Sequence, residues 1–85
     1  MIVFHVEYLD ELIDELQRAY TKHKGYTPAN PTMTDFERLV IVAEELGEVA
    51  RAMTYDEGDS KNLRRELIQL ATMSLAWVKG LDDTE

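Results

Sequence analysis

Residues 43–50 read AEELGEVA, and residues 64–71 read RRELIQLA. Each stretch carries two polar side chains three positions apart among small and apolar residues; these are Glu45 and Glu48, then Glu66 and Gln69. Positions three apart share one face of an α-helix, so each pair projects from one side of its helix. Two such helices packed antiparallel would bring three carboxylates and an amide together.

Apolar residues recur at spacings of three and four in three segments, which predicts three helices over about residues 4–22, 34–54 and 60–81. The first segment has the stripe Val6, Leu9, Ile13, Leu16 and Tyr20. The second has the stripe Phe36, Leu39, Ala43, Leu46, Ala50 and Met53. The third is apolar nearly all round, so we expect an all-α bundle of three helices that oligomerisation completes.

Two breaks separate these segments. Residues 24–33, KGYTPANPTM, contain one glycine and two prolines, which predicts a loop. Thr34 and Glu37 have the spacing of a capping box, which predicts that the second helix starts there. Residues 54–60, TYDEGDS, predict a turn at Gly58 and a helix N-cap at Asp59 or Ser60.

Length and composition narrow the class of protein. The 85 residues fit one domain, 1–85, whose small core favours a partner subunit. No cysteine is present, which excludes disulfides, a thiolate zinc site and a thiol nucleophile. The net charge of -8 repels nucleic-acid phosphates, so we expect no nucleic-acid partner.

Neither a membrane segment nor a targeting segment is predicted. The N-terminus MIVFHVEYLDEL lacks a basic region and an unbroken apolar run, unlike a signal or transit peptide. The longest nearly apolar stretch, residues 67–78, is shorter than the about 20 residues that span a bilayer. We expect a soluble, cytoplasmic protein with no membrane partner.

The acidic pairs have two interpretations. Acidic residues number 17 of 85, so an E-x-x-E pair usually marks a solvated helix face. Here, however, the pairs stand among apolar neighbours, and Gln69 lies in the most apolar helix, where a polar group needs a partner. Carboxylates brought together repel unless a cation neutralises them, and oxygen ligands without His or Cys suit Mg²⁺ or Mn²⁺.

The two segments EELGEVARAM (44–53) and LRRELIQLATMSLAWV (63–78) resemble the MazG-like all-α nucleoside triphosphate pyrophosphohydrolases. That family has the signature E-x-x-E, a spacer, then E-x-x-D, and the resemblance covers about residues 34–81. It implies a Mg²⁺-dependent enzyme that splits an NTP or dNTP, non-standard ones included, into NMP and pyrophosphate. It also implies assembly as a homodimer or homotetramer.

The resemblance assigns roles residue by residue. Glu45, Glu48 and Glu66 match the family's metal-binding acids, and Glu45 and Glu48 are the candidates for orienting or deprotonating the attacking water. Gln69 stands where the family has Asp, so its amide oxygen would bind metal without adding a negative charge. The neighbouring Glu44 is an additional candidate ligand.

Basic residues near the acidic motifs are candidates for binding the phosphates; these are Arg51, Lys61, Arg64 and Arg65. Surface pairing with acidic neighbours explains them equally well. Tyr26, in the first loop, is a candidate base contact. The alternative function is a non-catalytic helical interaction module with a degenerate metal site, in which the acidic face is solvated.

Overall fold

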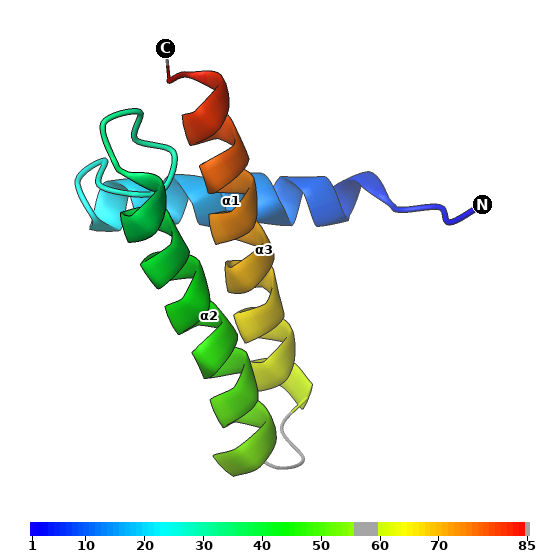
Figure 1. Ribbon diagram of the computed structural model, residues 1–85. Helices are drawn as coiled ribbons and strands as arrows, with labels where there is room; N and C mark the ends of the chain where they lie inside the picture. The colour runs from blue at the N-terminus through cyan, green and yellow to red at the C-terminus, as the bar shows by residue number, and fades with distance from the viewer. Residues whose placement is uncertain (56–59, 85) are drawn as a thin grey trace.

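A computed structural model describes residues 1–55 and 60–84, which form three α-helices and no strand. The helices are α1 (Val6–Lys22), α2 (Asp35–Tyr55) and α3 (Ser60–Asp82). α2 and α3 run antiparallel beside each other, and α1 crosses them (Figure 1). α3 packs against both α2 and α1, so it is the central helix. The predicted all-α class is confirmed.

The predicted boundaries hold to within two residues. α1 begins at Val6 instead of Phe4, because the N-cap, His5, has an extended backbone and makes no side-chain capping bond. α2 begins directly after Thr34, as expected. The predicted turn residue Gly58 and the candidate cap Asp59 lie outside the described residues.

The capping box at the start of α2 is confirmed. The Glu37 backbone N–H donates to Thr34 Oγ1 at 3.1 Å, and the Thr34 backbone N–H donates to Glu37 Oε1 at 3.0 Å. Both amides lack a partner within the helix, so the side chains satisfy them.

Small side chains dominate the core. The buried apolar residues are Ala19 of α1, Met33 of the first loop, Val49 and Ala52 of α2, and Met73 and Ala76 of α3. Alanines at these positions let the helix backbones approach closely, but they bury little apolar area. Within the described residues, no helix has both the length and the apolar character needed to cross a bilayer.

The apolar stripe predicted for α2 does not face the rest of the chain. We call it the outer stripe, and it consists of Phe36, Leu39, Ala43, Leu46, Ala50 and Met53. All six are exposed, with Phe36 at 74%, Leu46 at 57% and Met53 at 64% exposure. α2 instead presents Val49, Ala52 and the half-buried Glu45 inward, because small residues allow closer contact with α3.

The stripe predicted for α1 is also mostly exposed. Val6, Leu9, Ile13 and Tyr20 face outward, and only Leu16 is half-buried. α1 packs through the side that carries Ala19, since its contact is with α3 alone among the helices.

A buried arginine ties the first loop to α2. Arg38 is 2% exposed, and its Nη1 and Nη2 donate to Asp35 Oδ1 at 3.0 Å and to the Asn30 carbonyl at 2.8 Å. Trp77 Nε1 of α3 donates to the same Asp35 oxygen at 2.9 Å. The loop, the start of α2 and the end of α3 are therefore joined by one hydrogen-bond network.

Gly80 lets α3 pass beside this network. A Cβ at Gly80 would lie 2.2 Å from the Pro28 carbonyl oxygen and 2.6 Å from Arg38 Nη2. No side chain fits there unless the backbone or the buried guanidinium moves.

We expect Gly80→Ala to destabilise the protein by about 1–3 kcal/mol, the usual range for overpacking a filled site, despite alanine's better helix propensity. Thermal or urea unfolding measures the change. Ser74→Ala, at an exposed position of the same helix, is the control, and it should change stability by no more than about 0.5 kcal/mol. A Gly80→Ala variant as stable as Ser74→Ala would contradict the close packing.

Candidate functional site

Glu45 lies on the inner face of α2 and is half-buried. Its Oε2 atom is shielded from solvent and makes no hydrogen bond. A shielded carboxylate oxygen without a donor is costly, because protein groups do not replace the water that it loses on folding.

Several negative charges surround this carboxyl. Burial, and then the carboxylates of Glu66, Glu48, Glu44 and Glu15, raise the pKa of Glu45 above its ordinary value. The structure thus brings Glu48 of α2 and Glu66 of α3 close enough to act electrostatically on Glu45. We call these five residues the acidic cluster.

Glu15 of α1 is the member that sequence reasoning missed. It is half-buried on the side of α1 that carries Ala19, which packs in the core. In the sequence, Glu15 lies one helical turn from the small residue Ala19, which is the pattern of a side that packs closely. The apolar stripe of α1, however, predicts that a different side of the helix is buried. Only the crossing of α1 over α3 shows that Glu15 lies close enough to act on Glu45.

The acidic cluster is not arranged as a finished coordination sphere. Among residues 1–55 and 60–84, no three acidic or histidine side chains lie in positions that would together hold a metal ion. Glu44 and Glu48 are exposed, whereas Glu66 is half-buried. Mutual repulsion favours separated carboxylates when no cation is present.

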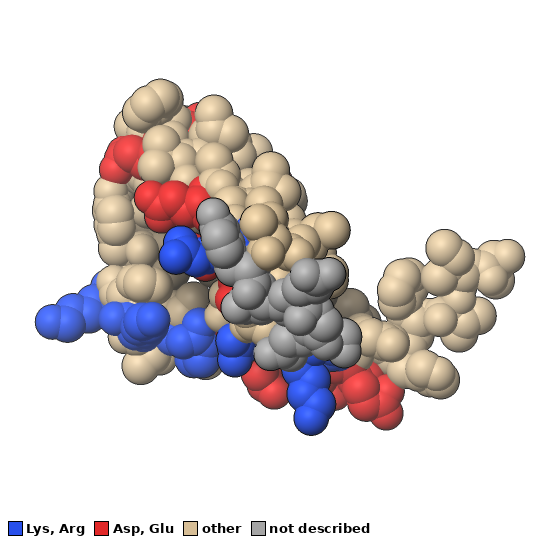
Figure 2. All heavy atoms as spheres, turned by 90° about the horizontal axis from the view of Figure 1, so that it is seen from below, with Lys and Arg blue, Asp and Glu red and all other residues tan. Residues whose placement is uncertain are grey.

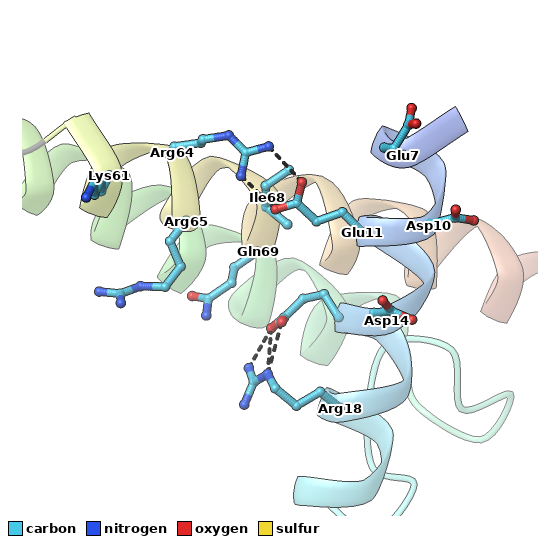
Figure 3. Close-up of a pocket in the computed structure, with 11 residues that line it drawn as sticks. Glu7, Asp10, Glu11, Asp14, Arg18, Lys61, Arg64, Arg65, Ile68 and Gln69 are labelled. Carbon is cyan, nitrogen blue, oxygen red and sulfur yellow. Dashed lines mark hydrogen bonds and ion pairs between the residues drawn. The ribbon is translucent and has the colours of Figure 1, made fainter. Parts of the chain in front are cut away.

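A cleft of about 440 Å³ lies between α1 and α3 next to this cluster. Figure 3 shows its lining side chains projecting from both helices. From α1 come Glu7, Asp10, Glu11, Asp14, Glu15 and Arg18, and from α3 come Lys61, Arg64, Arg65, Ile68 and Gln69. Acidic and basic groups are therefore mixed in the cleft.

Two ion pairs are present in the cleft. Arg64 of α3 donates to both oxygens of Glu11 at 2.6 and 2.7 Å, which links α3 to α1 and lowers the pKa of the Glu11 carboxyl (Figure 3). Arg18 donates to Glu15 within α1 through Nε at 3.0 Å and Nη2 at 2.5 Å. The carboxylate of Glu15, and more weakly that of Glu45, raise the pKa of Arg18. Arg18 therefore lines the cleft and interacts electrostatically with two members of the acidic cluster.

Gln69 also lines this cleft. Its side chain is half-buried and extends from α3 into the space between the two helices (Figure 3). We expected its amide either to bind a cation or to donate a hydrogen bond to Glu66 or Glu48. In the described part of the chain the amide makes neither of these hydrogen bonds.

The predicted phosphate-binding residues fall into two groups. Lys61, Arg64 and Arg65 line the same cleft, whereas Arg51 lies on α2 outside it. Figure 2 shows basic side chains in a band along one side of the molecule, with acidic side chains beside them. The Tyr26 hydroxyl donates to the capping residue Glu37, which raises the pKa of Tyr26 and gives this side chain a structural partner.

The comparisons with known proteins found no match for this chain. No family model matches the chain, and neither the curated proteins nor the solved structures yield a match. The MazG-like resemblance therefore remains a prediction that depends on the residues themselves.

The raised pKa of Glu45 predicts how metal-free stability depends on pH. Its pKa in the unfolded chain is near the ordinary 4.5 and is higher in the folded protein, so folding favours the protonated form. Stability from this group is thus present below pH 4.5 and is lost as the pH rises through the folded pKa.

We expect Glu45→Gln to be more stable than the parent at neutral pH in the presence of a chelator, and the difference to shrink as the pH falls through the folded pKa of Glu45 and to be lost below pH 4.5. Thermal melts across that pH range test this. Asp10→Asn, which removes an exposed acid outside the acidic cluster, should not reproduce the pattern. If the Glu45→Gln variant had the same melting temperature as the parent at every pH, the negative charge of Glu45 would not destabilise the folded protein.

Proposed function

We propose that this chain is a Mg²⁺-dependent nucleotide pyrophosphohydrolase, with Mn²⁺ as a substitute, that splits an NTP or dNTP into NMP and pyrophosphate. Non-standard nucleotides are included among its substrates. The observation that carries the proposal is the shielded, unpartnered oxygen of Glu45, surrounded by further carboxylates and adjacent to a cleft with four basic side chains. Such an arrangement suits a ligand that consists of a cation and a polyphosphate together.

The donor set fits a hard divalent cation. Glu45, Glu48 and Glu66 would hold it, with the Gln69 amide oxygen and Glu44 as further oxygen donors. When bound, Mg²⁺ supplies charge neutralisation and Lewis acidity to the phosphates and to a water. Side-chain rotation would draw the separated carboxylates together, because the cation removes their repulsion.

The chain's own residues then have defined tasks in the reaction. The oxygen of a water forms a bond to the α-phosphorus while the bond from that phosphorus to the bridging oxygen breaks, and pyrophosphate leaves. Glu48 or Glu45, through an oxygen that holds no metal, orients the water and accepts its proton. Lys61, Arg64 and Arg65 stabilise the charge on the departing pyrophosphate. We place this activity in the cytoplasm, where nucleoside triphosphates are made and used.

We expect wild-type protein with Mg²⁺ to release pyrophosphate from at least one member of a panel of natural and modified NTPs and dNTPs. Glu45→Gln and Glu66→Gln should each lower the rate by about 100-fold or more, as expected for loss of a catalytic or metal-binding carboxylate. Both substitutions should also abolish the rise in melting temperature that Mg²⁺ causes in the parent by binding the folded state.

Asp82→Asn is the matched control, because Asp82 is an exposed acid of α3 outside both the acidic cluster and the cleft, and it should retain both the activity and the Mg²⁺-induced shift. The proposal fails if no nucleotide is hydrolysed, or if Mg²⁺ stabilises the parent and the two variants equally.

The alternative is a non-catalytic interaction module, and the exposed outer stripe favours it. Six apolar or small residues form this stripe on one face of α2, and such faces usually bind another helix. This alternative expects no hydrolysis and no specific stabilisation by Mg²⁺, so the experiment above separates the two functions.

We also propose that the protein assembles as a homodimer or homotetramer through the outer stripe. The stripe alternates spacings of three and four over its whole length, which is the heptad pattern of helices that pack side by side. It lies on the side of α2 that no other helix of the described chain covers. A second copy brings an identical stripe, and two such stripes pair by two-fold symmetry.

We expect Leu46→Asp to convert the oligomer into a monomer or to unfold it, because the charge would be buried between subunits. Light scattering with circular dichroism at micromolar concentration distinguishes these two results. Thr21→Asp adds the same charge at an exposed polar position of α1 and should leave the assembly unchanged. A folded monomeric parent would contradict the proposed assembly.

A further inference from the structure

The cleft between α1 and α3 contains a basic residue with no assigned role, Arg18. The geometry points to this cleft as a binding site for metal-chelated pyrophosphate, with Arg18 as the residue of α1 that positions its phosphate oxygens. This inference rests on the proposed function, because it states which part of the substrate lies in the cleft and which helix contributes the donor.

Arg18 is the basic residue on the α1 side of the cleft. The other three, Lys61, Arg64 and Arg65, come from α3. A phosphate group between the two helices would therefore accept hydrogen bonds from both walls, and Arg18 would supply those from α1. The cleft's volume of about 440 Å³ lies within the range of small-molecule sites.

One nitrogen of the Arg18 guanidinium is not engaged by Glu15. Its Nε and Nη2 are engaged by Glu15, but Nη1 makes no hydrogen bond within the described residues. The Arg18 side chain is 51% exposed, so it is accessible to a ligand. A guanidinium binds phosphate oxygens through parallel N–H donors, and this geometry makes arginine well suited to the task.

Arg18 also connects the cleft to the acidic cluster. Its positive charge interacts with the carboxylate of Glu45, the residue with the shielded and unpartnered oxygen. A ligand held by Arg18 is consequently close to the residues that would hold the cation. Pyrophosphate in the cleft would thus lie beside the position where it leaves the α-phosphorus.

The balance of charge in the cleft determines which form of pyrophosphate binds. Five acidic residues and four basic ones line the cleft, so the cleft as a whole does not attract a free anion; the acids are Glu7, Asp10, Glu11, Asp14 and Glu15. A divalent cation on pyrophosphate reduces the negative charge and offers the carboxylates a partner. The cleft therefore selects the chelate over free pyrophosphate.

Calorimetric titration with pyrophosphate, in the presence of Mg²⁺ or of a chelator, tests this inference. We expect wild-type protein to bind magnesium pyrophosphate and to bind free pyrophosphate at least about tenfold more weakly, since an uncompensated anion meets the acidic wall. Arg18→Gln should weaken binding of the chelate by roughly 10- to 100-fold, the usual effect of losing a charged hydrogen bond.

Two further variants make the assignment specific. Lys22→Gln removes the same charge from an exposed position one turn further along α1, outside the cleft lining, and should bind like the parent. Glu15→Gln removes the carboxylate that occupies Arg18 and one negative charge of the cleft, so it should bind free pyrophosphate more tightly than the parent does. Circular dichroism verifies that each variant is folded.

The outcomes separate this inference from the proposed function. If the parent hydrolyses nucleotides but Arg18→Gln binds the chelate as tightly as Lys22→Gln, the role of Arg18 is wrong and the activity stands. If binding depends on Arg18 but no nucleotide is hydrolysed, the site stands and the activity is wrong. Failure of the parent to bind magnesium pyrophosphate, or equal affinity for free pyrophosphate, overturns the inference.

Discussion

A guanidinium with almost no solvent contact, that of Arg38, joins parts of the chain that are distant in sequence. It holds the Asn30 carbonyl and the Asp35 carboxylate, and Asp35 in turn accepts from Trp77 of α3. Nη1 and Nη2 are engaged in this way, which offsets much of the cost of burying the charge, whereas the buried Nε has no partner within the described residues. The network thus ties the start of α2 to the C-terminal part of α3, the two helices that carry Glu45 and Glu66.

The position of Glu45 is unfavourable for the stability of the folded chain. Its carboxyl is partly buried among like charges, and one oxygen has no donor. A protein selected for stability alone would place an apolar residue there, as α2 does on the same face with Val49 and Ala52. Local destabilisation of this kind is typical of functional sites, where a ligand supplies the missing interaction.

The two sides of α2 carry different kinds of side chain. The inner side carries Glu45 between small residues that let α3 approach, and the outer stripe carries the larger apolar side chains. The small residues bury little area, so the single chain gains little hydrophobic stabilisation from its own core. Assembly through the outer stripe would add that stabilisation and leave the cleft between α1 and α3 open.

The sequence by itself determined the three helices, the capping box at Thr34 and Glu37, and the pairing of Glu45 with Glu48 and of Glu66 with Gln69 on helix faces. These features depend on contacts between residues within about one helical turn, so the spacing of residue types along the sequence is enough to predict them. Which face of each helix is buried was decided only in the tertiary structure, where small residues packed inward and the larger apolar stripes remained outside. The same holds for Glu15 and Arg18, because their approach to Glu45 follows from the angle at which α1 crosses α3, and no spacing along the chain encodes that angle.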